Sequence, residues 1–214
     1  MFESLGAFLS KLATSFSGRL IEWIIERFKR PTIRLKRAPE NLFDHIAPGT
    51  SLARAREVLG TAHRIDGQWH SFAFSDAHVQ IGSEDGQSAQ WVGVVLPKLD
   101  RRAQFPIAVG GMGPLVLGKS TLADVLALDP DAKLKRESST KHWCFWVECY
   151  FGFSGMYRHY LFGVIEAPCV LPPDFEWDHV NNRLASDPKT VRFNWMAVSG
   201  SQGAAESFNY WAFV

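Results

Sequence analysis

The sequence predicts an α+β protein with two tandem helix-plus-antiparallel-sheet repeats, preceded by an N-terminal amphipathic helix. Three observations support this prediction. Apolar residues recur every three or four positions over the first 30 residues. A short helical segment near residue 51 is followed by three strand-like runs joined by tight turns. A similar helical segment returns 70 residues later, at residue 121, and strands follow it again.

The predicted N-terminal region, residues 1–37, is an amphipathic helix followed by a basic linker. Pro31 ends the helix because proline disfavours the helical conformation of the preceding residue. Charged residues within the helix make a membrane-spanning position costly, so we expect the helix to lie on a surface or to pack on protein. Its apolar residues are Phe2, Leu5, Leu9, Leu12, Phe16, Leu20, Trp23 and Phe28.

The first predicted repeat covers residues 38–105. Its helix spans residues 51–59 and ends at Gly60. The strand-like runs 68–74, 78–82 and 90–96 follow, and the polar turn before the last of them indicates a hairpin. Short connections of this kind predict an antiparallel sheet.

The second predicted repeat covers residues 106–214. Thr121-Leu122-Ala123 corresponds to Ser51-Leu52-Ala53 and begins its helix. A loop at residues 167–189, which contains four prolines, is predicted to interrupt the strands. The predicted strands are residues 141–151, 158–165, 192–198 and 208–214.

The composition is that of a folded, nearly neutral protein. The chain has 214 residues, 46% of them hydrophobic, and a net charge of +1, which excludes a disordered chain. No run of about 18 apolar residues occurs and no secretory signal is recognised, so we expect a cytoplasmic location. Cys144 and Cys149 are predicted on opposite faces of one strand, and three cysteines cannot all pair, which favours a reducing compartment.

A basic cluster next to the N-terminal helix is the clearest electrostatic feature. It could hold the helix on an anionic membrane surface, or it could be a solvated linker beside a helix that packs on protein. Nucleic acid is an unlikely partner because the rest of the chain is neutral to acidic. The cluster consists of Arg27, Lys29, Arg30, Arg34, Lys36 and Arg37.

Aromatic residues make up 13% of the chain, including eight tryptophans, and several do not fit an inward-facing position. In the run 142–151, alternation places Trp143, Phe145 and Val147 on one face and Trp146 and Tyr150 on the other. A sheet face with Trp and Tyr is suited to binding another protein, although a helix or the other repeat could instead cover it. The predicted partner-binding residues are Trp69, Trp91, Trp146 and Tyr150.

Residues 113–120 match the phosphate-loop pattern G-x-x-x-x-G-K-S. The nucleotide-binding residues would be Gly113, Gly118, Lys119 and Ser120. However, three large apolar residues fill the variable positions, and antiparallel strands follow instead of alternating strands and helices. We therefore expect Leu115 and Leu117 to anchor the chain before a helix capped by Ser120 or Thr121.

The sequence predicts no catalytic residue, cofactor or metal site. His142 and Cys144 lie on one face of a predicted strand, as two metal ligands would, but no third ligand can be identified from the sequence.

These features together resemble the beta-lactamase inhibitor protein fold, which is also the fold of small outer-membrane assembly lipoproteins. The resemblance rests on Ile46-Ala47-Pro48-Gly49-Thr50-Ser51-Leu52, on Val58-Leu59-Gly60, and on a looser second copy from Leu117. It covers about residues 42–214. It implies helices on one face of an antiparallel sheet and a protein partner held on the other, often aromatic, face.

The sequence thus favours a non-catalytic interaction protein or adaptor. It would bind a protein partner, or another copy of itself, through an aromatic sheet face and dock by its N-terminal helix. One alternative is a membrane-associating effector or sensor that uses the helix and the basic cluster at the membrane periphery. A second alternative is a nucleotide-binding protein that uses residues 113–120.

Overall fold

The computed structural model describes residues 36–99, 104–109, 112–139 and 142–201. The chain divides into two compact units, Met1–Arg34 and Leu35–Val214, and all described residues belong to the second. The predicted N-terminal helix and the predicted last strand therefore lie outside the described residues. So do four members of the basic cluster, Arg27, Lys29, Arg30 and Arg34.

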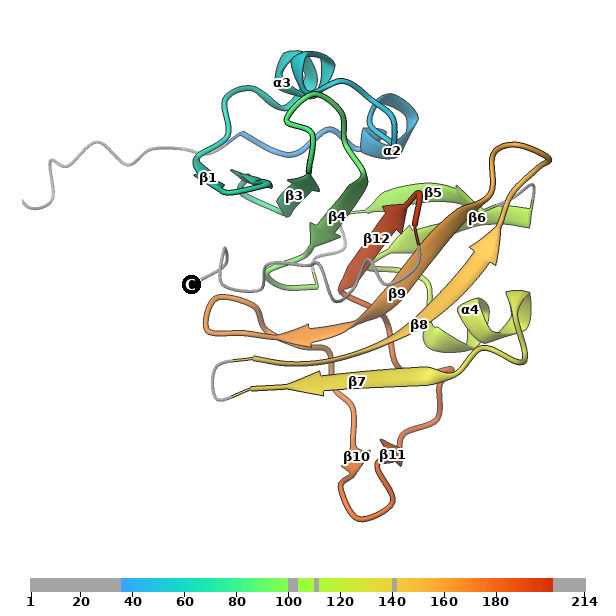
Figure 1. The fold of residues 1–214 in the computed structure, drawn as a ribbon. Helices are drawn as coiled ribbons and strands as arrows, with labels where there is room; N and C mark the ends of the chain where they lie inside the picture. The colour runs from blue at the N-terminus through green and yellow to red at the C-terminus, as the bar shows by residue number, and fades with distance from the viewer. Residues whose placement is uncertain (1–35, 100–103, 110–111, 140–141, 202–214) are drawn as a thin grey trace, which may run out of the picture. The chain divides into compact units, whose positions relative to one another are not determined.

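The described part of the second unit consists mostly of strands, with three short helices (Figure 1). The helices are α2 (Leu42–His45), α3 (Leu52–Leu59) and α4 (Leu122–Leu128). The strands before α4 are β1 (Arg64–Asp66), β2 (Trp69–Ala73), β3 (His78–Gly82), β4 (Trp91–Val95), β5 (Phe105–Val109) and β6 (Met112–Leu117). Those after it are β7 (Leu134–Ser138), β8 (Trp143–Phe151), β9 (Arg158–Glu166), β10 (Trp177–Asp178), β11 (Arg183–Leu184) and β12 (Trp195–Ser199).

Eight strands form one antiparallel sheet in the order β1-β2-β3-β4-β12-β9-β8-β7. The half formed by β1 to β4 follows α3, and the half formed by β7, β8, β9 and β12 follows α4. The two halves join through the pairing of β4 with β12. The α+β class and the antiparallel sheet are therefore confirmed, and the order of elements fits a helix followed by strands in each half.

The helices cover one face of this sheet, where the main hydrophobic core lies. Leu42, Leu52 and Ala55 pack in the same cluster as strand residues such as Val79 and Val94. The β5–β6 hairpin contributes Phe105 and Leu117 to the same cluster. Farther along this face, Phe145 and Val164 pack with Leu122 of α4 and with aromatic residues of the 167–189 loop. We call this the helix face.

Local sequence explains where the helices begin and end. The Ser51 side chain accepts a hydrogen bond from the Arg54 backbone N–H at 3.2 Å and so caps α3. Gly60 ends α3 with a φ of 89°, a conformation that favours glycine. At α4, the backbone N–H and hydroxyl of Thr121 donate to the Asp124 carboxylate. The expectation that Ser120 or Thr121 caps this helix is confirmed, and the capping residue is Thr121.

Strands β1, β5, β6 and β7 were not predicted from the sequence, nor was the small β10–β11 hairpin within the predicted loop at residues 167–189. Strand β1 has three residues and is exposed throughout, and the burial of β7 does not alternate clearly between faces, so neither has a clear period-two signal. Alternation along the predicted strand 192–198 would place Phe193 and Trp195 on the same face, which is wrong. Strand β12 begins at Trp195, and Phe193 packs on Phe162 in the helix-face core.

Candidate functional site

The four predicted partner-binding aromatic residues lie on one face of the sheet, opposite the helix face. The register shows this directly, because directly paired residues on neighbouring strands point to the same side. Trp69 pairs with Gly82 and Gly82 with Trp91, and the row continues through Ser199 and His159 to Tyr150. Trp146 is four residues before Tyr150 on β8 and shares its face. We call this the aromatic face.

In each half of the sheet, a glycine on one strand is paired with a tryptophan on each of its two neighbouring strands. Trp69 and Trp91 flank Gly82, and their rings lie 4.8 Å apart. Trp146 and Trp195 flank Gly163, and their rings lie 5.9 Å apart. A Cβ on Gly82 would overlap the Trp91 indole, and one on Gly163 would overlap the Phe145 carbonyl and crowd Trp146, so both positions favour glycine. This repeated Trp-Gly-Trp arrangement was invisible in the sequence because it depends on the strand register.

Exposure divides the aromatic face into two parts. Trp91 and Trp146 are only 4% and 5% exposed, whereas Tyr150 is 56% exposed. Near Cys144 and Trp195, the turn that holds Ala167 and Val170 packs against this face. The most exposed of the four predicted binding residues, Tyr150, therefore lies at the end of the face near the turn between β8 and β9.

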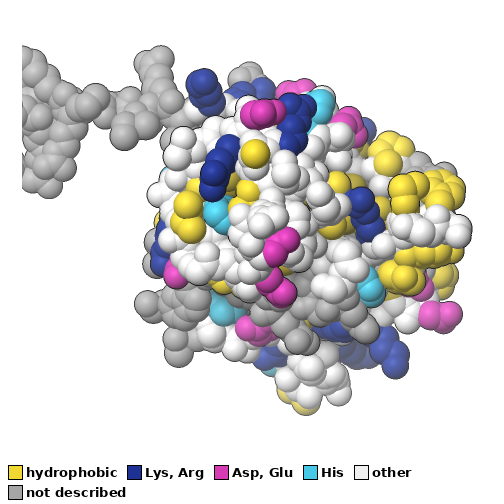
Figure 2. Space-filling view, turned by 45° about the horizontal axis from the view of Figure 1, so that its top comes forward, with side chains coloured by type: hydrophobic (Ala, Val, Ile, Leu, Met, Phe, Trp, Pro, Cys, Tyr) yellow, Lys and Arg dark blue, Asp and Glu magenta, His cyan; other side chains and the backbone are white. Residues whose placement is uncertain are grey.

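At this end, exposed apolar side chains gather around Tyr150. Its ring stacks on Tyr157 with centroids 5.2 Å apart and contacts the His159 ring at 4.6 Å. Figure 2 shows hydrophobic side chains collected at the edge of the molecule where Figure 1 places the β8–β9 turn. We define the hairpin patch as Tyr150, Phe153, Met156 and Tyr157, each of which is largely exposed.

A groove of about 500 Å³ adjoins the hairpin patch. One wall is the segment from Gly155 to Arg158, and the others are the loops containing Pro48, Ala89 and Gly200. Arg158 is the one charged side chain among its lining residues in the described part of the chain. The groove therefore offers backbone groups, uncharged polar side chains and apolar surface, which suit an uncharged chain segment.

A buried carboxylate supports the patch from below. The Glu148 carboxylate lies 2.7 Å from the Lys135 ammonium and 3.0 Å from His159 Nδ1. The Glu148 side chain is almost fully buried. The Glu148 contact fixes the orientation of the His159 ring, which in turn lies against Tyr150. The Tyr150 ring thus packs on the His159 ring, which is held in place by its contact with Glu148.

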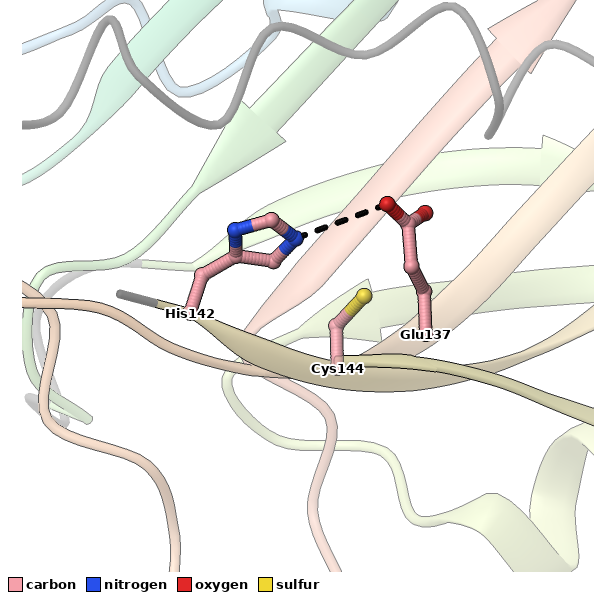
Figure 3. A group of neighbouring side chains, drawn as sticks. All are labelled: Glu137, His142 and Cys144. Carbon is pink, nitrogen blue, oxygen red and sulfur yellow. Dashed lines mark ion pairs between the residues drawn. The ribbon is translucent and has the colours of Figure 1, made fainter. Parts of the chain in front are cut away.

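The structure also supplies the third potential metal ligand that the sequence did not reveal. Glu137 pairs directly with Cys144 across β7 and β8, and His142 stands just before β8. One ligand atom from each side chain lies within 4.8 Å of the other two (Figure 3). Glu137 could have been suspected only by predicting a strand before residue 140 and its register with β8.

The segment that matched the phosphate-loop pattern has a different shape. Met112–Leu117 forms strand β6, and Leu115 and Leu117 are buried in the core, as expected for the structural interpretation. The Ser120 hydroxyl accepts a hydrogen bond from the Val116 N–H at 3.0 Å. A phosphate loop needs curled backbone with several N–H groups turned toward one anion. An extended strand from Gly113 to Leu117 cannot provide it, although Gly118, Lys119 and Ser120 do form a turn before α4.

Of the basic cluster, Lys36 and Arg37 fall within the described residues. The Arg37 guanidinium contacts the Asp76 carboxylate at 2.8 Å and Glu40 at 3.7 Å. The Asp76 carboxylate also accepts from the Ala38 N–H, and the Lys36 carbonyl accepts from the Ser75 N–H. Arg37 therefore helps to attach the linker to the turn between β2 and β3.

Comparison of the chain with protein-family models, curated proteins and solved structures gave no significant match. Within the described residues, the helices are too short and too polar to cross a membrane.

Proposed function

We propose that this protein is a non-catalytic interaction module that binds a protein partner through the hairpin patch, at the end of its aromatic face near the turn between β8 and β9. The observation that carries the proposal is the gathering of Tyr150, Phe153, Met156 and Tyr157 on the surface of one hairpin. Exposed aromatic groups concentrated in one place are typical of sites that contact another protein.

The patch has a rigid base, which favours binding. Strands β8 and β9 pair over nine consecutive positions, from Trp143–Glu166 to Phe151–Arg158. Tyr150 is further held by Tyr157 and by the His159 ring on Glu148. Side chains already ordered before association lose less conformational entropy when a partner binds.

The adjoining groove indicates the form of the partner. Its volume is within the usual range for binding clefts, and its mainly uncharged lining fits an extended peptide segment. A partner segment that places an apolar side chain against Met156 and Tyr157 would bury both the patch and the groove wall. We therefore propose an extended, largely uncharged segment of another protein as the ligand.

Because Trp91 and Trp146 are buried, the proposed contact lies at the hairpin patch and not at the centre of the aromatic face. In this proposal the tryptophans build the face, and Tyr150 is the one predicted binding residue that contacts the partner. The N-terminal amphipathic helix, with the basic cluster, is proposed as a second docking element. A chain lacking residues 1–37 distinguishes membrane docking by this helix from binding at the patch.

Site-specific photo-crosslinking in the native cell tests the proposal. A photoreactive amino acid is placed at Met156 in the full chain, and crosslinked proteins are identified by mass spectrometry. We expect one protein to be crosslinked and the yield to fall at least fivefold when Tyr150→Ser and Tyr157→Ser are added. Ile65→Ser, at an exposed apolar residue of β1, is the matched control and should leave the yield unchanged.

The proposal is overturned if no protein is crosslinked, or if the yield is unaffected by the paired tyrosine changes. A chain lacking residues 1–37 is analysed in parallel. If its membrane-fraction content falls while crosslinking at Met156 persists, the helix docks on lipid independently of the patch.

A further inference from the structure

Glu137, His142 and Cys144 bring three different metal-binding groups together at the edge of the sheet. β7 and β8 pair so that Glu137 lies opposite Cys144, and His142 is two residues before Cys144 on the same side. The His142 Nε2 atom is 3.6 Å from Glu137 Oε1, and Figure 3 shows the ring and the carboxylate turned toward each other. We propose that these three residues form a binding site for a divalent transition metal ion, with Zn²⁺ as the ion that fits best.

The donor set determines the choice of ion. Imidazole nitrogen, thiolate sulfur and carboxylate oxygen are the ligands of protein zinc sites, whereas Mg²⁺ and Ca²⁺ prefer oxygen alone. Together one thiolate and one carboxylate neutralise the charge of a divalent cation. Three protein ligands leave a fourth tetrahedral position for a water molecule.

The distances fit this coordination after a small adjustment. Bonds of roughly 2.0–2.3 Å to a tetrahedral zinc ion place neighbouring ligand atoms about 3.5 Å apart. The His142–Glu137 separation of 3.6 Å already has this value. The largest separation within the group, at most 4.8 Å, requires a movement of about 1 Å. Glu137 can supply it because its flexible side chain is 44% exposed.

A second side chain sets the orientation of the histidine ring. The Ser139 hydroxyl lies 2.8 Å from His142 Nδ1. When Nδ1–H donates to this oxygen, the lone pair of Nε2 points toward Glu137 and Cys144, as a metal ligand requires. The same hydroxyl accepts the His142 backbone N–H at 3.2 Å, which fixes its position.

Burial and nearby charge are also compatible with a metal ion. Cys144 is fully buried and His142 nearly so, while Glu137 faces solvent and provides a path for entry. The lysine on the same face, Lys135, is engaged by Glu148 at 2.7 Å. A bound ion would connect the edge strand β7 to β8 through side chains as well as through the backbone ladder.

Cobalt substitution tests the site without needing a known activity. The full chain is treated with a chelator, and Co²⁺ or Zn²⁺ alone is then titrated. We expect one Co²⁺ per chain, with a thiolate-to-cobalt charge-transfer absorption band that Zn²⁺ abolishes by displacement. The band should disappear in Cys144→Ser and persist in Cys169→Ser, whose cysteine is exposed and outside the group.

Two further variants keep the result interpretable if Cys144→Ser fails to fold. Glu137→Gln changes an exposed position and should weaken Zn²⁺ binding, measured by calorimetry, by more than tenfold. Ser139→Ala leaves all three ligands in place and should weaken binding by roughly 10–100-fold, as expected for loss of a ligand-orienting group. Circular dichroism checks that each variant is folded.

The proposal is overturned if no charge-transfer band appears at one equivalent of Co²⁺. It is also overturned if Cys169→Ser removes the band, or if Zn²⁺ affinity is the same in wild type and Glu137→Gln. In those cases Glu137 and His142 form an ion pair at the sheet edge only.

Discussion

At the scale of single residues, His78 makes stability depend on pH. It lies on the aromatic face, where it pairs with Val95 of β4. Burial, together with the smaller effect of the neighbouring His63, lowers its pKa from 6.5 to about 4. The folded protein thus binds a proton at His78 less readily than the unfolded chain does. Stability from this residue is complete above pH 6.5 and is lost as pH falls toward 4.

We expect His78→Gln to flatten the loss of stability in acid. Between pH 7 and pH 4.5 the free energy of unfolding should fall by about 2 kcal/mol less in the variant than in the wild type. Urea unfolding at the two pH values measures this difference. His179→Gln, at an exposed loop residue, serves as the control. Equal pH dependence in wild type and His78→Gln would contradict the prediction.

At the scale of elements, α4 shows how a very short helix is held in place. Seven residues are too few for a stable isolated helix, so its stability depends on capping and packing. Leu122 and Val125 are buried, and the Asp124 carboxylate accepts from the Thr121 N–H at 2.7 Å. The acidic side chain also lies in the first turn, where it interacts favourably with the helix dipole.

Replacing Asp124 should therefore destabilise the protein measurably. Asp124→Ala removes both hydrogen bonds from Thr121 and is expected to lower the free energy of unfolding by about 1 kcal/mol. Asp131→Ala, at an exposed position shortly after the helix, removes the same charge and should have a much smaller effect. Thermal unfolding of the two variants side by side makes the comparison, and equal losses would disprove a capping role.

At the scale of the whole sheet, the described strands of the two halves carry similar residues at matching positions of the register. The pair Gly93–Ala197 lies at the centre of the β4–β12 register, and Trp91 and Trp195 each precede it by two residues. Gly82 pairs with Trp91 and Gly163 pairs with Trp195, so Gly82 of β3 corresponds to Gly163 of β9. The tandem repeats stay a prediction, and the matching positions of these residues in the two halves of the sheet are what that prediction requires.

The equivalence predicts that Gly82→Ala and Gly163→Ala have similar effects. A Cβ at Gly82 would overlap the Trp91 indole, and one at Gly163 would overlap the Phe145 carbonyl and lie 2.8 Å from the Trp146 Cβ. Each change should cost about 1–3 kcal/mol of stability. Gly200→Ala is the control, because its nearest neighbour, Pro48 Cβ, would be at 3.8 Å.

Both variants should retain one unfolding transition, because β4 and β12 join the halves in a single sheet. Hydrogen exchange should show the amides of β3 and β9 losing protection together in either variant. Loss confined to the half that carries the substitution would show that the halves unfold separately.

The sequence by itself determined the features that depend on neighbouring residues. Alternation along 142–151 correctly placed Phe145 on one face and Trp146 and Tyr150 on the other. The helix over 51–59 was predicted with Gly60 at its end, and Cys144 and Cys149 do lie on opposite faces. Such signals are local because the side-chain periods of strands and helices repeat within a few residues.

Only the tertiary structure decided what depends on register and burial. The placement of Glu137 beside His142 and Cys144, and of a glycine between each pair of tryptophans, follows from hydrogen-bonded pairing between strands. The difference in exposure between Trp146 and Tyr150, which lie on the same face of one strand, follows from distant packing. A local pattern cannot reveal either, because a shift of one residue in the pairing would move every side chain to the opposite face.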